Sequence, residues 1–343
     1  MCLYSSALRS LLFCLEPETS HSIALQSLKW STSIPFLKKA IQKRYTFSHI
    51  GLERKLWGIT FVNPIGLAAG FDKNASYIDE LACLGFGFIE IGTVTPRPQE
   101  GNPPPRLFRL AEDYALVNRM GFNNDGVDAV AKRLQKRKSS IVIGGNIGKN
   151  KSTPNEYASQ DYLTCFEKLF DHVDYFAINV SSPNTPQLRQ LQDKEPLTRL
   201  LSTLQEANQK KTRSKPLLLK IAPDITSEQL EEIAEIVIQT QFNGVIATNT
   251  TISRENLKTS KSRIESIGSG GLSGKPLTAK STDVIRLLEQ KSCGKFDIVG
   301  VGGIFSPEDA REKIRAGAKL IQLYTGFVYQ GPSLPSSIAR NLI

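Results

Sequence analysis

Polar and glycine-rich runs recur along the chain, and most of them directly follow a short apolar run. They contain two lysines and five asparagines, namely Lys73, Lys220, Asn118, Asn146, Asn179, Asn184 and Asn249. An asparagine side chain carries a hydrogen-bond donor and an acceptor on a short stem, which suits a planar ring with amide and carbonyl edges. A lysine close by could hold an anionic group. We therefore predict that these residues surround one flat, polar ligand.

Each of these residues also has an ordinary structural explanation. A lysine at the end of a strand can extend into water, and a lone asparagine often occupies a turn or caps a helix. Five asparagines in loops of the same kind are harder to explain in that way, so binding is the preferred interpretation.

Two glycine-containing runs near the C-terminus are typical of a phosphate site. Gly302-Gly303 and Tyr324-Thr325-Gly326 each follow an apolar run and precede a helical pattern. Backbone N–H groups can approach an anion closely where no side chain intervenes, and the start of a helix adds its dipole. No G-x-G-x-x-G run opens a helix after an early strand, so a Rossmann nicotinamide domain is not indicated. The phosphate is therefore expected to belong to a mononucleotide cofactor.

The elements that must position these residues form an alternating pattern from Phe61 onward. Short apolar or β-branched runs predict eight strands, at 61–68, 86–93, 141–147, 175–180, 216–221, 244–250, 298–301 and 320–324. Helical patterns lie between or after them, including 77–84, 157–170, 228–238, 282–290, 307–316 and 336–341. Eight strand-then-helix units indicate an α/β fold, a (β/α)8 TIM barrel, which carries its chemistry at the carboxyl ends of the strands. A hairpin around Gly58 is expected to close the barrel floor.

Composition excludes several classes of protein. The chain has 343 residues, of which 40 % are hydrophobic and 22 % charged, so a folded, globular protein is expected. No run of 18 apolar residues occurs, which argues against a transmembrane helix. The five cysteines are scattered without a C-x-x-C spacing, and the three histidines form no ligand-like pair. These patterns argue against a disulfide framework and a metal site, and they favour a reducing compartment.

The N-terminal 60 residues carry half of the formal net charge of +10, from eight basic and three acidic side chains. They hold two runs with helical spacing, from Leu3, Tyr4 and Ala7 to Leu15 and from Ile23 to Trp30, with Pro17 as the expected first residue of the second helix. One interpretation is a helical cap with a solvated basic face. The other is a helical pair lying in a membrane interface on anionic lipid. No groove-reading motif for nucleic acid is present.

Eight motifs, taken in order, resemble those of the dihydroorotate dehydrogenase family, in particular its quinone-linked, membrane-associated class 2. They lie at 63–73, 90–98, 118–123, 146–150, 179–185, 248–251, 270–274 and 300–304. The resemblance covers essentially the whole chain. It implies an FMN-dependent oxidation of (S)-dihydroorotate to orotate in pyrimidine (UMP) biosynthesis, with a membrane quinone as the electron acceptor.

The resemblance also implies roles for individual residues. FMN would be held by Ala69, Gly70, Lys73, Thr93, Asn146, Asn179, Lys220, Thr248, Gly274, Gly303, Tyr324 and Thr325. The substrate would be held by Lys73, Asn118, Arg119, Met120, Gly121, Phe122, Asn179, Asn184, Asn249 and Thr250. No metal is implied.

Ser182 matches the catalytic base of the family. The soluble class 1 enzymes carry cysteine there, so Ser182 and the N-terminal helices together indicate class 2. The implied reaction removes the C5 proton of dihydroorotate to Ser182, while hydride passes from C6 to the flavin. A serine hydroxyl is a poor base, so Thr185 with an ordered water is the candidate relay. Without the resemblance, Ser182 would be interpreted as a turn hydroxyl before Pro183. The polar segment 184–192 is a candidate lid.

The N-terminal helices of the family form an apolar passage for the quinone, and His21 and Arg109 match the histidine and arginine at its inner end. A helix-capping role for His21 is the alternative. We expect residues 1–48 to form this helical unit and residues 49–343 the FMN-binding barrel. Peripheral attachment to anionic lipid on the cytoplasmic face of a bacterial inner membrane is expected, with no nucleic acid and no obligate protein partner.

Three other functions remain open from the sequence. A soluble, fumarate-linked dihydroorotate dehydrogenase would carry cysteine in place of Ser182. A flavin-free barrel lyase or isomerase would be colourless, and a basic membrane- or RNA-binding module would leave the asparagines unexplained. Residues 252–269 are Ser/Lys-rich and are expected to form a mobile surface loop without an assigned role. Glu16 before Pro17 is a weaker helix cap than the aspartate that is usual there.

Overall fold

The structure is a computed structural model that describes residues 8–343, and its centre is a closed barrel of eight parallel strands. The strands are β3 (Ile65–Leu67), β4 (Phe88–Val94), β7 (Val142–Ile147), β8 (Tyr175–Asn179), β9 (Leu217–Ile221), β10 (Gly244–Ala247), β12 (Asp297–Val301) and β13 (Ala318–Leu323). They pair in the order β10-β12-β13-β3-β4-β7-β8-β9, and β9 pairs with β10 to close the ring. The predicted TIM barrel is confirmed.

The largest difference from the predicted strands lies at 61–68. Pro64 interrupts this run, because proline has no N–H to donate to a neighbouring strand. The run is therefore divided between β2 (Ile59–Phe61), which belongs to the floor hairpin, and the barrel strand β3. The strand predicted at 244–250 ends at Ala247, so Thr248, Asn249 and Thr250 lie in the loop beyond it.

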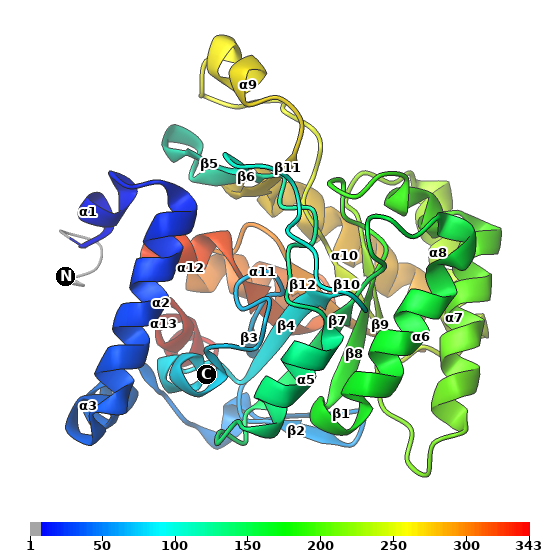
Figure 1. The fold of residues 1–343 in the computed structure, drawn as a ribbon, viewed down its shortest axis with the longest axis horizontal. Coiled ribbons are helices and arrows are strands. Elements are labelled where there is room, and N and C mark those ends of the chain that lie inside the picture. The colour runs from blue at the N-terminus through cyan, green and yellow to red at the C-terminus, as the bar shows by residue number, and fades with distance from the viewer. Residues whose placement is uncertain (1–7) are drawn as a thin grey trace.

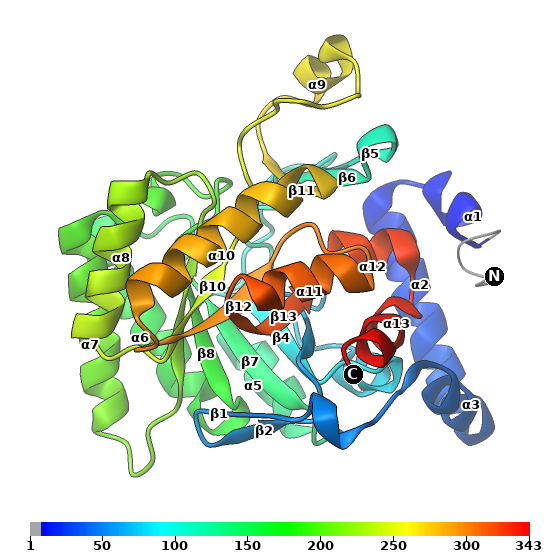
Figure 2. The ribbon, with the colours of Figure 1, turned by 180° about the vertical axis from the view of Figure 1, so that it is seen from behind.

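Helices surround the barrel on its outer face (Figures 1 and 2). They are α4 (Ile78–Leu81), α5 (Val127–Gln135), α6 (Ala158–Leu169), α7 (Lys194–Gln209), α8 (Ser227–Gln239), α10 (Thr278–Ser292), α11 (Pro307–Arg315), α12 (Thr325–Gln330) and α13 (Leu334–Asn341). Local sequence sets several of their starts. Thr226 and Gln229 form a capping box for α8, and Ser306 caps α11 directly before Pro307.

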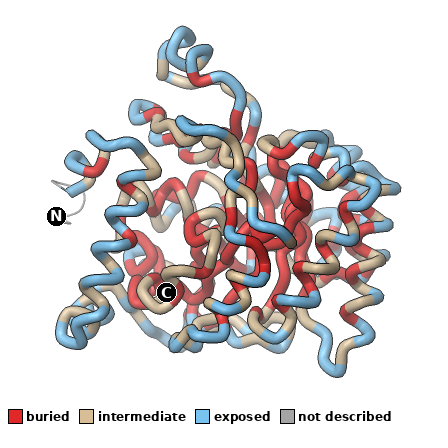
Figure 3. The backbone as a smooth tube through the Cα atoms, viewed as in Figure 1, coloured by how far each residue is buried: buried red, intermediate tan, exposed pale blue. Residues whose placement is uncertain are grey.

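Two layers of buried side chains hold the barrel together. Figure 3 marks the buried positions of the chain in red. The larger layer lies between strands and helices, and the smaller one fills the inside of the barrel around Phe61, Phe88, Tyr175 and Leu218. Phe61 comes from the hairpin of β1 (Arg54–Leu56) and β2, and its ring lies 5.4 Å from that of Phe88. The predicted hairpin is thus present, and its Phe61 side chain plugs the inside of the barrel.

A three-stranded antiparallel sheet lies over the other end of the barrel, and the sequence patterns did not predict it. It consists of β5 (Leu107–Leu110), β6 (Ala115–Asn118) and β11 (Gly271–Gly274), in the order β11-β6-β5 (Figure 1). β11 is far from the other two strands in sequence, and its pairing places Gly271 opposite Asn118. Two of the predicted site segments are therefore brought together by this small sheet.

The N-terminal segment forms α1 (Arg9–Phe13), α2 (Pro17–Ser33) and α3 (Pro35–Tyr45) beside the barrel (Figure 1). Pro17 begins α2 as predicted, although Glu16 makes no capping hydrogen bond through its side chain. The third helix was not predicted, and Leu3, Tyr4 and Ala7 of the first predicted run lie outside the described residues. Leu25 of α2 is buried in the outer core, so these helices pack against the barrel.

Residues 252–269 are more structured than the predicted surface loop. They contain α9 (Lys261–Ile267), which projects away from the barrel (Figure 1). The entry to α9 is held by Asp113, whose carboxylate accepts hydrogen bonds from the backbone N–H groups of Lys258 (2.6 Å) and Thr259 (3.1 Å). The loop patterns missed these contacts because Asp113 is distant in sequence.

Candidate active site

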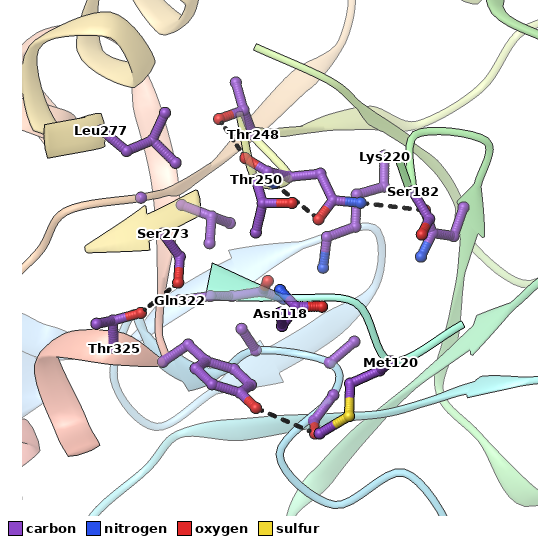
Figure 4. A pocket seen from close by; sticks show the side chains of 18 of the residues that line it. Asn118, Met120, Ser182, Lys220, Thr248, Thr250, Ser273, Leu277, Gln322 and Thr325 are labelled. Atoms are coloured by element: carbon purple, nitrogen blue, oxygen red, sulfur yellow. Dashed lines mark hydrogen bonds between the residues drawn. The ribbon is translucent and has the colours of Figure 1, made fainter. Parts of the chain in front are cut away.

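One cavity opens at the carboxyl ends of the barrel strands, where barrel enzymes place their chemistry. Figure 4 shows its polar lining: Lys220, Ser182, Thr250, Ser273 and Thr325 come from different segments and surround the same space. Most of the predicted site residues line it, namely Ala69, Gly70, Lys73, Thr93, Asn118, Met120, Gly121, Phe122, Asn179, Ser182, Asn184, Lys220, Thr248, Asn249, Thr250, Gly274, Gly303, Tyr324 and Thr325.

A buried ion pair lies below the cavity. Glu90 is fully buried on β4, and one of its carboxylate oxygens accepts hydrogen bonds from Lys220 Nζ (3.0 Å) and Asn146 Nδ2 (2.9 Å). Its other oxygen accepts from Gln322 Nε2 (2.6 Å) and the Tyr175 hydroxyl (3.3 Å). The carboxylate thereby fixes Lys220 at the cavity wall, since a buried lysine needs a compensating charge.

A second network orients the amides of the wall. Asn179 Nδ2 donates to Thr93 Oγ1 (2.8 Å), and Thr93 Oγ1 donates to Asn146 Oδ1 (2.5 Å). Asn249 Nδ2 donates to Ser181 Oγ (3.0 Å), which in turn donates to Asn179 Oδ1 (3.1 Å). These bonds fix which edge of each amide faces the cavity, so the donors and acceptors are preorganised.

Ser182 stands on the loop after β8 and is held by the residues that follow it. Its Oγ accepts a hydrogen bond from the backbone N–H of Asn184 (3.2 Å), and Asn184 Nδ2 donates to Asn118 Oδ1 (3.1 Å). Thr185 is buried but does not line the cavity, and its hydroxyl has no partner among the described residues. The structure therefore places Ser182 in the site, and it leaves the Thr185 hydroxyl available to a water molecule.

The loop 184–192 packs over this region as a well-anchored segment. Leu188 and Leu191 are buried, and Arg189 donates to the backbone carbonyls of Ser181 (3.1 Å) and Thr250 (3.0 Å). Arg189 also pairs with Asp224 at 3.0 Å. Segment 184–192 can act as a lid only if these contacts break. Its role as a lid stays a prediction.

Lys73 is the cation at the side of the cavity that faces the N-terminal helices. Burial lowers its pKa to about 8, with Arg106 acting in the same direction and Glu18 and Asp72 opposing it. Glu18 of α2 pairs with Arg106 at 3.1 Å, so the helical segment contributes charge next to the site. Lys73 is therefore charged at pH 7 and loses its charge as the pH rises through about 8.

The opposite end of the cavity offers mainly backbone. Gly302 and Gly303 have φ of +115° and +72°, and a Cβ on Gly303 would lie 2.6 Å from the backbone nitrogen of Thr278. Glycine is thus required at position 303. The adjoining start of α12 contributes the N–H groups of Thr325 and Gly326, which have no partner within a helix. Thr325 Oγ1 donates to Ser273 Oγ at 2.8 Å. These groups could bind a phosphate.

Two of the residues predicted to bind the cofactor or the substrate do not face the cavity. Asn146 lies behind its wall and orients Thr93 and Asn179. Arg119 is turned away, since its guanidinium donates to the carbonyls of Ile267 (2.6 Å) and Pro105 (3.0 Å). Asn118 and Arg119 are neighbours in extended backbone, where successive side chains point to opposite faces. Only Asn118 lines the cavity, so the placement does not favour a direct substrate contact by Arg119.

His21 and Arg109 join the N-terminal helices to the site. His21 Nε2 donates to the carbonyl of Phe71 (2.9 Å), and the Phe71 ring lies 5.7 Å from that of Tyr324 in the cavity wall. Burial lowers the His21 pKa to about 4, with Lys73 adding to the effect. Arg109 donates to Leu15 O (2.6 Å) and Ser20 Oγ (2.9 Å). His21 lies inside α2, so the capping alternative for it is wrong.

Sequence reasoning assigned no role to several residues of the site. Ser273, Leu277 and Gln322 line the cavity, and Glu90 and Tyr175 support it from below. Glu90 had a detectable signal, because a carboxylate inside an apolar strand needs a buried partner. Gln322 is likewise a polar residue inside an apolar strand, and its Oε1 is buried without a partner among the described residues. Ser273 had no such signal, because its position depends on the small sheet.

Comparison with known proteins identifies the family. A family model described as dihydroorotate dehydrogenase matches residues 51–343. The chain belongs to this family. A protein of Christiangramia forsetii named dihydroorotate dehydrogenase (quinone) is 57 % identical over 341 residues, which cover 99 % of both chains. One of Thermosynechococcus vestitus with the same name is 49 % identical and covers 99 % of this chain and 96 % of its own.

Solved dihydroorotate dehydrogenases have the same fold. The Eimeria tenella enzyme in complex with ferulenol superimposes with a TM-score of 0.83 at 36 % identity, covering 95 % of this chain and 90 % of its own. Its ligand-free form gives a TM-score of 0.82 at 38 % identity, with 93 % of both chains covered. Because the quinone-type relatives match over the full length, the N-terminal helices included, this dihydroorotate dehydrogenase is of class 2. The family is flavin-dependent.

Proposed function

We propose that the chain oxidises (S)-dihydroorotate to orotate in pyrimidine biosynthesis, using bound FMN and passing the electrons to a membrane quinone. The observation that carries this function is the cavity itself, in a chain of this family. It joins the Ser182 hydroxyl, the Lys73 and Lys220 cations and a set of oriented amides at the carboxyl end of the barrel.

The residues present fit FMN. The Oε1 of Gln322, which has no partner among the described residues, and the oriented amides suit a ring with polar edges, and Lys220 provides a cation beside it. Gly302, Gly303 and the start of α12 provide backbone donors for a phosphate. When bound, FMN supplies the hydride acceptor for the reaction. Thr93, Asn179, Thr248 and Gly274 would complete its site, with Ala69, Gly70, Tyr324 and Thr325 along its rim.

The residues around Ser182 suit proton removal from the substrate. Ser182 would accept the proton of C5, and Thr185 with a water would pass it on, since the Thr185 hydroxyl has no other partner among the described residues. Lys73 would bind the substrate carboxylate. Asn118, Asn184, Asn249 and Thr250 would hold its amide and carbonyl groups, as their side chains line the same wall. These donors would stabilise the charge that develops as the proton leaves.

The quinone would enter between the N-terminal helices and the barrel. His21 and Phe71 form a contact that leads from α2 to Tyr324 in the cavity wall, with ring distances of 4.7 and 5.7 Å. Arg109 donates hydrogen bonds to Leu15, between α1 and α2, and to Ser20 of α2, and so holds the two helices in place. With its lowered pKa, His21 is neutral at pH 7, so it adds no charge to an apolar passage.

The N-terminal helices also suit attachment to a membrane surface. Their large apolar side chains Leu11, Trp30 and Phe36 are 66, 67 and 77 % exposed. Lysines and arginines accompany them, which favours anionic lipid. Within the described residues, no helix is long and apolar enough to cross a membrane. We therefore propose peripheral attachment, on the cytoplasmic face of a bacterial inner membrane, through the unit of residues 1–48 beside the barrel of residues 49–343.

The absorption spectrum of the purified protein tests the function. A yellow protein whose flavin bands bleach anaerobically with dihydroorotate, and return on addition of a quinone analogue, is the expected result. Bleaching that is reversed by fumarate but not by the quinone analogue would contradict the proposal that a quinone is the electron acceptor. A colourless protein that binds no FMN would contradict the function.

A further inference from the structure

Lys313 is a fully buried cation that has no role in the mechanism above. It lies on α11, and its Nζ donates three hydrogen bonds, to the carbonyl of Thr278 (2.7 Å), Ser281 Oγ (2.5 Å) and Thr282 Oγ1 (2.6 Å). All three acceptors are uncharged and belong to the first five residues of α10. Among the described residues, no carboxylate lies within 4 Å of this ammonium group.

This position is unfavourable for an isolated positive charge. A buried cation is normally paired with an anion, because burial removes its hydration. The start of a helix also carries a partial positive charge that repels cations. Both effects predict that a nearby anion stabilises the charged form of Lys313. Burial lowers its pKa to about 8, although Asp309, Glu312 and Asp283 act in the opposite direction from a distance.

The same turn of α10 also contacts Gly302 and Gly303 at the end of the cavity, which we call the glycine loop. Thr278 Oγ1 donates to the carbonyl of Gly303 (2.8 Å), and Ser281 Oγ donates to the carbonyl of Gly302 (3.0 Å). Thr278 and Ser281 thus contact Lys313 on one side and the loop on the other. Hydrogen bonds within the described residues do not use the N–H groups of Gly302 and Gly303, which are free to bind a ligand.

We propose that Lys313 is a positioning residue for the phosphate of the cofactor, which holds the glycine loop through Thr278 and Ser281 and adds a buried positive charge behind it. The inference rests on the proposed function, because it requires FMN in the cavity. It concerns the phosphate alone, so the flavin ring should be bound equally well with or without the charge of Lys313.

Comparison of FMN with riboflavin, which lacks the phosphate, separates this role from a merely structural one. We expect Lys313→Met in the full-length chain to raise the dissociation constant of FMN by about tenfold to a hundredfold, since a charge in a site of low dielectric acts strongly on a dianion. The dissociation constant of riboflavin should change by less than about twofold on the same electrostatic grounds. Flavin fluorescence on dilution of the loaded protein measures both. An unchanged affinity for FMN, or an equal loss for both flavins, would overturn the proposal.

The unaltered protein offers a second test that does not depend on a variant that folds. Raising the pH from 7 to 9.5 neutralises Lys313, on which Asp309, Glu312 and Asp283 act electrostatically, while the phosphate keeps its charge. The ratio of FMN to riboflavin affinity should therefore fall as the pH rises. Lys73 loses its charge over the same range, because its pKa is also lowered to about 8, so the fall is assigned to Lys313 only if it persists in Lys73→Met. A constant ratio would refute the role of Lys313. A chain that binds neither flavin would refute the proposed function instead, so the two failures are distinguishable.

Discussion

At the scale of single residues, the hydroxyl of Ser182 is the group expected to limit proton removal. We predict that Ser182→Ala keeps its FMN but slows flavin reduction by dihydroorotate by about 10²–10⁴, the usual effect of losing a positioned base. Anaerobic stopped-flow absorbance measures this step alone. The internal control is the re-oxidation of the reduced variant by a quinone analogue, which should be unchanged. Reduction at the original rate would remove Ser182 from the role of base.

Lys73 should give substrate binding a pH dependence. Its pKa is lowered to about 8, so the side chain is charged at pH 7 and loses its charge as the pH rises through 8. The KM for the anionic dihydroorotate should therefore increase with pH, by about tenfold between pH 7 and 9 if the charge is needed for binding. Lys73→Met should have a high KM that varies less with pH. A KM of the unaltered enzyme that stays constant over this range would contradict a contact between Lys73 and the carboxylate.

At the scale of elements, the N-terminal helices should be needed for the quinone but not for dihydroorotate. Deletion of residues 1–45 is expected to abolish quinone reduction and binding to anionic vesicles, while dihydroorotate still reduces the flavin. The deletion exposes apolar surface of the barrel that Leu25 covers. Circular dichroism must therefore first confirm a folded barrel. Full quinone activity in a folded truncation would refute the proposed passage.

Single exposed side chains provide a milder test of the membrane surface. Phe36→Ser on α3 should weaken binding to anionic vesicles, because it removes a side chain that is 77 % exposed. Tyr157→Ser is the matched control, since Tyr157 is 52 % exposed in the segment before α6. Vesicle sedimentation measures both, with flavin reduction as the check on folding. Equal losses in the two variants would contradict a surface confined to the N-terminal helices.

At the scale of the whole molecule, the Glu90–Lys220 pair connects two strands, β4 and β9, that are not neighbours in the barrel. Glu90 on β4 accepts from residues of β7, β8, β9 and β13, so its loss affects the ring as a unit. We predict that Glu90→Leu lowers the free energy of unfolding by about 3–5 kcal/mol, because Lys220 is left buried without a counter-charge. Denaturation in urea without added flavin measures it, and the double variant with Lys220→Met should recover part of the loss. No recovery would show that the packing of Glu90 matters rather than its charge.

Local sequence patterns were enough to predict the barrel and most of the site. Eight apolar runs with helical patterns between them are local signals, and a parallel barrel places whatever follows each strand at one end. Lys73, Ser182, Lys220 and the asparagines of the loops could therefore be predicted to converge. Pro17 and Gly58 marked a helix start and a hairpin for similarly local reasons.

The packing of the folded chain sets which side chains face the cavity and which residues support them. The sheet that pairs β6 with β11 joins segments about 150 residues apart, and no local pattern encodes such a pairing. It turns Asn118 toward the cavity and Arg119 away from it. Lys313 is a further example: its sequence context is that of an ordinary helical lysine, and only the packing of α11 against α10 buries it behind the glycine loop. Burial and long-range hydrogen bonds depend on neighbours in space, so they become visible only when the chain is folded.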